Sequence, residues 1–145
     1  MGESRETHTI ESLPEPECWT KLADHQVGRL VVSVGAQPDI FPVNYTLDEG
    51  TIVVRTAEGT KLAAALMGQR VAFEIDHIDE CNRVGWSVVV HGEARESRTL
   101  PSVIHDQDLD LEPWATGDKA RFIHIHPHRV TGRQLVPVPQ EEVAP

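Results

Sequence analysis

Most of this chain consists of short runs of β-branched and aromatic residues separated by glycine and proline. Such runs are typical of strands, because branched side chains pack well on a pleated, half-buried surface. The pattern predicts strands at residues 28–34, 39–46, 51–56, 70–76, 84–95 and 120–135, the last being one strand or a strand pair. Turns are expected at residues 35–38 and 47–50, where glycine occurs with proline or acidic residues.

Three details of these strands bear on the shape of the sheet. From Val71 to Ile75 every second residue is apolar, so one face of this strand meets a core and the other meets water or a ligand. The longest run contains Gly85 and Gly92, which allow it to bend around the corner of a barrel. Pro42 cannot donate to a strand ladder, which places it at a sheet edge, at a bulge or where the backbone meets a ligand.

Helical patterns are fewer and shorter. They are expected at residues 17–26, at 60–67 and within the acidic stretch 106–112. The second segment is rich in alanine and leucine and connects two predicted strands, which favours a crossover helix. About six strands with one crossover helix and two small helices predict a mainly β protein, a closed antiparallel sheet with helical caps.

The length and charge of the chain limit its class. Its 145 residues suit one domain, which we place at residues 15–136, between a loose N-terminal arm (1–14) and a loose tail (137–145). The formal net charge of −10 argues against nucleic acid as a partner. No apolar run has the length of a membrane span, and the N-terminus lacks the apolar core of a signal peptide. We therefore expect no membrane partner and a cytoplasmic location.

A candidate anion site lies where the third predicted strand leads into the crossover helix. The first N–H groups of a helix lack partners within it, and Arg55 and Lys61 add positive charge on either side of Gly59. A phosphorylated cofactor would fit there, with the hydroxyl of Thr56 as a further donor. The alternative is a solvated loop whose lysine points into water.

A second candidate site lies at the start of the longest strand. Trp86 and Ser87 follow Gly85, and together they offer an aromatic surface and a hydroxyl where another group can approach the backbone closely. A core tryptophan beside a serine at a ladder edge is the alternative interpretation.

Motifs for metal binding or hydrolysis are weak. His124, His126 and His128 have the spacing that shares one strand face, but a proline interrupts them and no cysteine or carboxylate is close in sequence. We predict no metal site. Haem ligation stays open through one of these histidines or through His25, His77 or His91. Cys18 and Cys81 are too isolated for a redox motif, and without a nucleophile elbow or a P-loop no catalytic side chain is proposed.

Taken in order, several of these segments resemble the pyridoxamine 5′-phosphate oxidase-like family of flavin-binding split barrels. The resemblance covers roughly Leu22 to Leu135 and rests on the segments 42–45, 55–61, 71–76, 85–92 and 130–133. It implies a six-stranded antiparallel split β-barrel and a homodimer with FMN in two equivalent grooves at the dimer interface.

The resemblance also implies roles for particular residues. The phosphate and ribityl chain of FMN would be held from one subunit by Arg55, Thr56, Lys61 and Leu62. Trp86 and Ser87 would approach the flavin from the other subunit. The isoalloxazine ring would lie along the backbone of Pro42, Val43, Asn44 and Tyr45. Apart from the resemblance, the sequence adds the negative charge of Glu74 and Asp76 beside the proposed groove, and it does not determine whether they face it.

The resemblance leaves the chemistry open. The chain lacks the C-terminal segment with which pyridoxamine phosphate oxidases recognise their substrate, so that activity is not expected. The first hypothesis is an FMN-dependent oxidoreductase, in which the flavin carries out the chemistry and the protein orients it. The alternatives are a reductase that uses a deazaflavin coenzyme in the same fold, and a carrier or sensor that binds flavin or haem without turnover.

Overall fold

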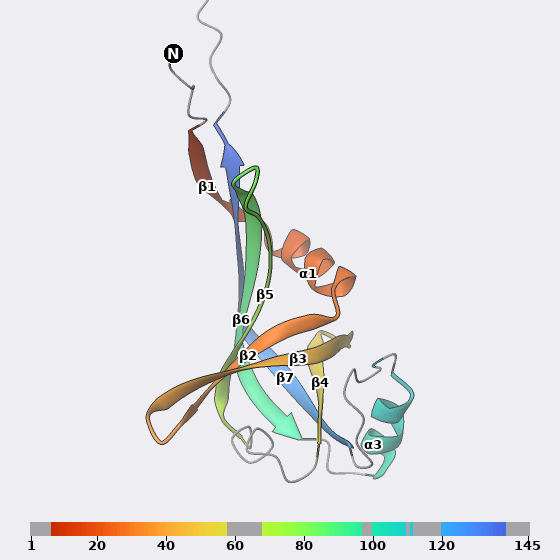
Figure 1. Cartoon of the computed structure of the whole chain (residues 1–145). Coiled ribbons are helices and arrows are strands. Elements are labelled where there is room, and N and C mark those ends of the chain that lie inside the picture. The colour runs from red at the N-terminus through yellow and green to blue at the C-terminus, as the bar shows by residue number, and fades with distance from the viewer. Residues whose placement is uncertain (1–6, 58–67, 97–99, 110, 112–119, 139–145) are drawn as a thin grey trace, which may run out of the picture.

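The computed structural model describes residues 7–57, 68–96, 100–109, 111 and 120–138 (Figure 1). In chain order, the elements are β1 (His8–Leu13), α1 (Glu15–Asp24), β2 (Val27–Val34), β3 (Gln37–Asp48), β4 (Thr51–Ala57), β5 (Arg70–Asp79), β6 (Val84–Glu96), α3 (Leu100–Gln107) and β7 (Ala120–Pro137). The crossover helix predicted at 60–67 lies outside the described residues. Among them, no helix is long and apolar enough to cross a bilayer.

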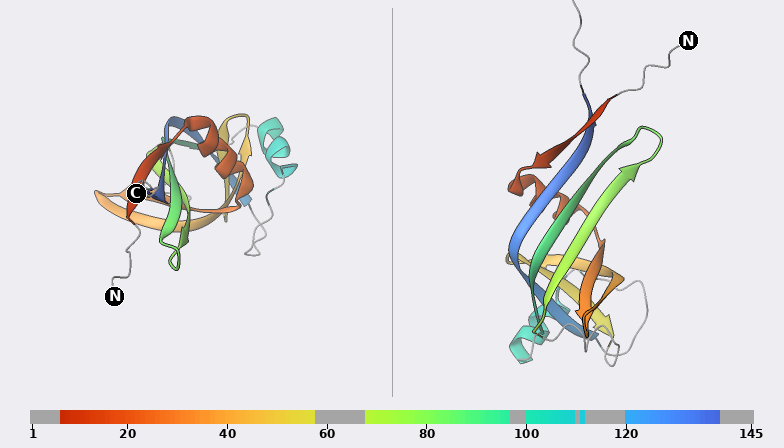
Figure 2. Two further views of the ribbon diagram at one scale, coloured as in Figure 1. Left: turned by 90° about the horizontal axis from the view of Figure 1, so that it is seen from above. Right: turned by 90° about the vertical axis from the view of Figure 1, so that its left-hand side faces the viewer.

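The sheet closes on itself. Strands β4, β3, β2, β5 and β6 are neighbours in that order, and β7 pairs with both β4 and β6, so six antiparallel strands form a ring (Figure 2). This confirms the predicted six-stranded antiparallel barrel. A seventh strand, β1, lies outside the ring and pairs with the far end of β7, from His8 opposite Pro137 to Leu13 opposite Gly132. The expectation of a loose arm over residues 1–14 is therefore wrong for residues 8–13, because backbone pairing orders a segment that has no apolar periodicity.

The core fills the ring with alternate residues of each strand, as the pattern between Val71 and Ile75 predicted. Helix α1 covers one side of it by burying Cys18 and Leu22 completely. The phenol of Tyr45 donates a hydrogen bond to the carbonyl oxygen of Leu22 at 2.7 Å, which ties the helix to β3. The capping role expected for the segment 17–26 is thus met by α1.

The last segment, predicted as one strand or a strand pair, is the single strand β7, and it contains a bulge. The register between β6 and β7 shifts after His91 pairs with Arg129, since Gly92 pairs with Pro127, so His128 is the extra residue of the bulge. A Cβ on Gly92 would lie 2.4 Å from the backbone oxygen of His126, so only glycine fits. The bulge allows β7 to run as one strand through its proline.

The helix expected in the acidic stretch lies further upstream. The described helix α3 begins at Leu100 and ends at Gln107, so it shares only two residues with the predicted segment 106–112. Pro101 suits its first turn, where the missing N–H has no helical partner to lose. Helix α3 lies beside β4 and the first half of β7 (Figure 1).

Candidate functional site

Strands β3 and β4 separate part of the way along their length. Their last pair is Tyr45 with Val54; beyond it β3 continues against β2, while β4 continues against β7 to the pair Ala57 with Ala120. Among the described residues, each strand therefore has one edge without a strand neighbour. We call this region, residues 37–44 of β3 and 55–57 of β4, the β3–β4 split.

The split lies where the sequence predicted cofactor contacts. Pro42 pairs with Arg29 of β2, and no described strand lies on its other side, which confirms its prediction at a sheet edge. Val43 and Tyr45 are buried in the barrel, so they can offer a ligand only their backbone groups. Burial raises the pKa of the Tyr45 phenol, which stays neutral.

Thr56 carries the clearest sign of a missing partner. Its side chain is only 7% exposed, and its Oγ1 atom has no hydrogen-bond partner within the described part of the chain. A buried hydroxyl without a partner costs about 1–3 kcal/mol, which a ligand oxygen at the split would offset. The residues at the split therefore fit a group that brings hydrogen-bond acceptors.

Arg55 supplies the positive charge. Its guanidinium lies over the ring of Phe122, 5.8 Å from the ring centre, on the outer face of β4. Because neighbouring residues of a strand point to opposite faces, Arg55 and Thr56 can reach one ligand only if it lies at the free edge between the two faces. Lys61 and Leu62, the other two residues predicted to contact phosphate and ribityl, lie outside the described residues.

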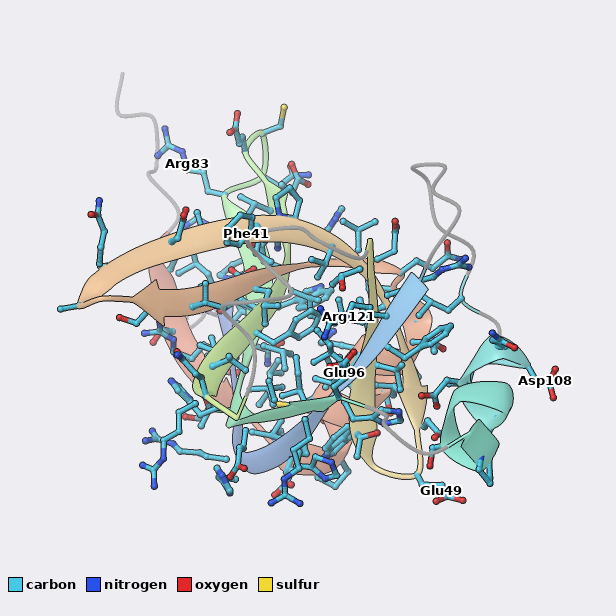
Figure 3. The ribbon with its side chains drawn as sticks, turned by 90° about the horizontal axis from the view of Figure 1, so that it is seen from below. Phe41, Glu49, Arg83, Glu96, Asp108 and Arg121 are labelled. Carbon is cyan, nitrogen blue, oxygen red and sulfur yellow. The ribbon has the colours of Figure 1, made fainter. Side chains whose placement is uncertain are left out.

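An ion pair next to Thr56 was not foreseen. Arg121, the β7 partner of Thr56, donates from Nε to Glu96 Oε1 at 2.6 Å and from Nη2 to Oε2 at 2.7 Å. Figure 3 shows these two side chains beside each other at the lower end of the barrel. The two residues are 25 positions apart, and only the β6–β7 pairing brings them together, so no local sequence signal could have identified them.

Trp86 and Ser87 lie far from this group within one chain. Trp86 pairs with Gln134 of β7, whereas Arg55 pairs with Phe122, twelve residues earlier on the same strand. Twelve residues of strand span up to about 40 Å. Trp86 instead packs against α1, with Lys21 Nζ 4.5 Å from the centre of its ring and the His25 ring edge-on at 5.0 Å. One chain does not bring the two predicted halves of the site together.

The acidic residues expected beside the groove are paired. Glu74 and Asp76 lie on the outer face of β5, and Arg29 Nη2 contacts both of them, at 2.5 Å and 3.0 Å. Burial, followed by a hydrogen bond with Asp76, raises the pKa of the Glu74 carboxyl, against the opposing effect of Arg29. The outer face of β5 therefore carries less negative charge than its two carboxyls suggest.

A separate cluster surrounds His124. Its Nε2 atom lies 3.0 Å from both oxygens of Asp106, and the Nε2 atom of His105 lies 3.1 Å from Asp48. These residues line a cavity of about 650 Å³ between α3, β7 and the β3–β4 turn. No carboxylate lies close to His124 in the sequence, but the fold brings the carboxylates of Asp48 and Asp106 near it.

The three closely spaced histidines do not converge on one point. The ring centres of His124 and His126 are 6.4 Å apart, and His126 lines the same cavity. His128, at the bulge, lines a different cavity of about 380 Å³ together with His91. The three histidines are therefore evenly spaced in the sequence but do not form one set of metal ligands.

The closed ring of strands and the separation of β3 from β4 define a split β-barrel. The family model described as pyridoxamine 5′-phosphate oxidase matches residues 14–134, and the chain belongs to this family. This confirms the family resemblance seen in the sequence.

Known relatives extend over most of the chain. One similar crystal structure is described as a putative pyridoxamine 5′-phosphate oxidase from Corynebacterium glutamicum, and its sequence is 35% identical to this chain. The match covers 90% of this chain and all of the other chain, and the two superpose with a TM-score of 0.78. A structure of an FAD binding protein from Mycobacterium smegmatis is 37% identical over 86% of this chain and 98% of its own, with a TM-score of 0.74. An uncharacterized Mycobacterium tuberculosis protein is 35% identical over 132 residues, 88% of this chain and 86% of its own length.

Proposed function

We propose that this protein is a flavin-dependent oxidoreductase that binds FMN at the β3–β4 split, in a groove between two copies of the chain. The observation that carries the proposal is the buried Thr56 hydroxyl, which lacks a partner among the described residues and lies at a strand edge beside Arg55. Membership of the pyridoxamine 5′-phosphate oxidase family, and a 37% identical relative described as binding FAD, support a flavin as the ligand.

The residues at the split would divide the work of binding. Arg55 would form charge-assisted hydrogen bonds to the phosphate, and Thr56 would donate its hydroxyl to a phosphate or ribityl oxygen. The backbone of β3 at residues 42–44, where no described strand lies on the side away from β2, would offer groups to the polar edge of the ring. A bound flavin supplies hydride or single-electron transfer, and the protein orients it and excludes water.

A second copy would complete the groove. Trp86 and Ser87 lie on β6 opposite Gln134 and Arg133, too far from Phe122 for them to reach a ligand held by Arg55 of the same chain. Large apolar side chains are exposed at Ile40, on the free part of β3, and at Ile78, near the β5–β6 turn, at 59% and 61%. Each is a single exposed apolar side chain, so the case for a second copy rests on the distance between the two predicted groups of contacts. We therefore propose a homodimer in which each flavin contacts both copies.

FAD is the second candidate ligand. FMN and FAD share the ring, the ribityl chain and the first phosphate, so Arg55 and Thr56 would make the same contacts with either. The name of the Mycobacterium smegmatis relative favours FAD. FAD would differ by placing a second phosphate and an adenosine outside the contacts of the split.

The first test is to purify the protein without a tag, record its visible spectrum and identify any released chromophore by chromatography. The stripped protein is then titrated with FMN, FAD, a deazaflavin coenzyme and haem. We expect FMN or FAD binding that Arg55→Ala weakens about 10- to 150-fold, the equivalent of about 1.5–3 kcal/mol for hydrogen bonds to a charged group.

Arg129→Ala removes an exposed arginine in the middle of β7 and is the matched control, with unchanged affinity expected. Equal affinities in wild type and Arg55→Ala would place the flavin elsewhere, and a protein that binds neither flavin would refute the proposal. Light scattering with and without flavin tests the dimer. Reduction of the bound flavin by NADH or NADPH, followed by reoxidation in air, tests turnover. If neither donor reduces the flavin, the protein is a flavin carrier and not an oxidoreductase.

A further inference from the structure

The cavity beside α3 collects metal-ligating side chains from three separate elements. Asp48 ends β3, His105 and Asp106 lie in the last turn of α3, and His124 lies on the outer face of β7. Ligand atoms of Asp48, Asp106 and His124 all lie within 4.8 Å of one another. We propose that this Asp–His cluster binds one divalent transition-metal ion, with Zn²⁺ as the reference ion, through Asp48, Asp106 and His124, and His105 as the fourth ligand.

The hydrogen bonds of His124 point to a cation. The hydroxyl of Thr51 donates to the carbonyl oxygen of Asp48 at 2.7 Å, and that oxygen can only accept. Thr51 Oγ1 must therefore accept from Nδ1 of His124, 3.0 Å away, which places the ring proton on Nδ1. The lone pair of a neutral ring then lies on Nε2, facing the Asp106 carboxylate at 3.0 Å.

A lone pair facing an anion is repulsive unless a positive charge lies between them. That charge is either a second proton on the ring or a metal ion that both groups bind. The histidine fits the metal alternative, because metal-bound histidines typically hold their other nitrogen by a hydrogen bond to a fixed oxygen. Thr51 supplies that hydrogen bond.

Burial and charge favour the ion. Asp106 is only 2% exposed, and a buried carboxylate is stable only when a positive group compensates it. Among the described residues that line the cavity, the carboxylates of Asp48, Glu49 and Asp106 outnumber the one guanidinium, at Arg95, because the fourth carboxylate, Glu96, is paired with Arg121. Arg95 is itself engaged with Glu93, at 3.3 Å. The cavity therefore has an excess of negative charge that attracts a divalent cation.

The distances suit a tetrahedral ion after a small adjustment. Zinc bonds of about 2.0–2.1 Å place neighbouring ligand atoms roughly 3.4 Å apart in a tetrahedron. The His124–Asp106 and His105–Asp48 contacts, 3.0 Å and 3.1 Å, would open slightly as the ion enters. His105 is exposed, so its ring can move to close the site. Two imidazoles and two carboxylates are a donor set that zinc accepts.

The ion would have a structural role distinct from flavin binding. It would hold α3 against β7 and the β3–β4 turn, with ligands from all three elements. Thr51 and Arg55 are four residues apart on β4, about 13 Å along the strand. The metal test below uses no flavin, so its result is independent of the proposed function.

Tag-free full-length protein is treated with a chelator, desalted and titrated with Zn²⁺ by calorimetry, with metal content checked by mass spectrometry. We expect one ion per chain and a higher melting temperature with Zn²⁺. Co²⁺ as a second probe should give the intense visible bands of a tetrahedral site. Asp106→Asn keeps the shape of the side chain and should lower Zn²⁺ affinity at least about 100-fold, since changing a residue that only holds a metal ligand in place already costs 10- to 100-fold.

Two further variants separate a ligand from a structural residue. Thr51→Val keeps all four ligands and should lower Zn²⁺ affinity about 10- to 100-fold. This variant still tests the site if Asp106→Asn does not fold. His126→Asn changes another histidine that lines the cavity and should leave the affinity unchanged. Absence of Zn²⁺ and Co²⁺ binding in wild type would overturn the proposal and leave a protonated His124–Asp106 pair. Zn²⁺ binding that Asp106→Asn and Thr51→Val both leave intact would overturn it too.

Discussion

Replacing Thr56 by valine should change stability and flavin affinity in opposite directions. Valine has nearly the same shape as threonine, so the substitution removes the hydroxyl and little else. Because this hydroxyl is buried and has no partner among the described residues, it costs the flavin-free protein about 1–3 kcal/mol. The flavin-free Thr56→Val variant should therefore be more stable than wild type, by about 3 °C in melting temperature for each kcal/mol.

The same substitution should weaken flavin binding. If the Thr56 hydroxyl donates to a phosphate or ribityl oxygen, its loss removes one hydrogen bond to the ligand, worth roughly a factor of 10 in affinity. Thermal unfolding of the stripped protein and fluorescence titration with FMN measure the two effects on the same samples.

Thr51→Val is the matched control for stability. It makes the same change on the same strand, but the Thr51 hydroxyl donates to the Asp48 carbonyl at 2.7 Å, so its loss should destabilise the protein. A stripped Thr56→Val protein that melts lower than wild type would refute the reasoning, because its hydroxyl would then have a partner. Unchanged flavin affinity would remove Thr56 from the binding site.

The remaining predictions concern the barrel itself. Gly92→Ala places a Cβ 2.4 Å from a backbone oxygen of β7 and should destabilise the protein by at least about 2 kcal/mol in urea unfolding. Hydrogen bonds from Asn82 lower the pKa of Asp79, so Asp79→Ala should be destabilising at pH 7, by a margin that shrinks as the pH falls below the ordinary value of 3.8; a constant margin would contradict this. A thiol reagent should modify exposed Cys81 in the native protein and reach buried Cys18, whose thiol pKa burial raises, only after unfolding.

The predictions that held depended on local patterns. Alternation between Val71 and Ile75 identified a strand with one buried face, since side-chain direction in a strand has a period of two. Pro42 identified an edge because a proline lacks the N–H that an inner ladder needs. The family resemblance rested on the order of such segments, which the family match at residues 14–134 confirmed.

The wrong prediction and the contacts that were not predicted all depend on how distant segments pair. Strand β1 has no apolar periodicity, and its ladder with β7 places it in the sheet. His124 looked isolated because its carboxylate partners, Asp106 and Asp48, belong to other elements. Arg121 meets Glu96 only through the register of β6 and β7. Strand register determines the first and the third, and the packing of α3 beside β7 determines the second.

By itself, the sequence determined the class of the protein: strand runs, an edge proline, a cation next to a threonine and the motifs of one family. These features are local, so their chemistry can be read without knowing what lies opposite them. The tertiary structure alone decided that β3 and β4 separate at the predicted site, that Thr56 is buried there with no hydrogen-bond partner among the described residues, and that two aspartates meet two histidines beside α3. The physical reason is that burial and partnership are properties of pairs of segments, which closing the sheet brings together and periodicity does not encode.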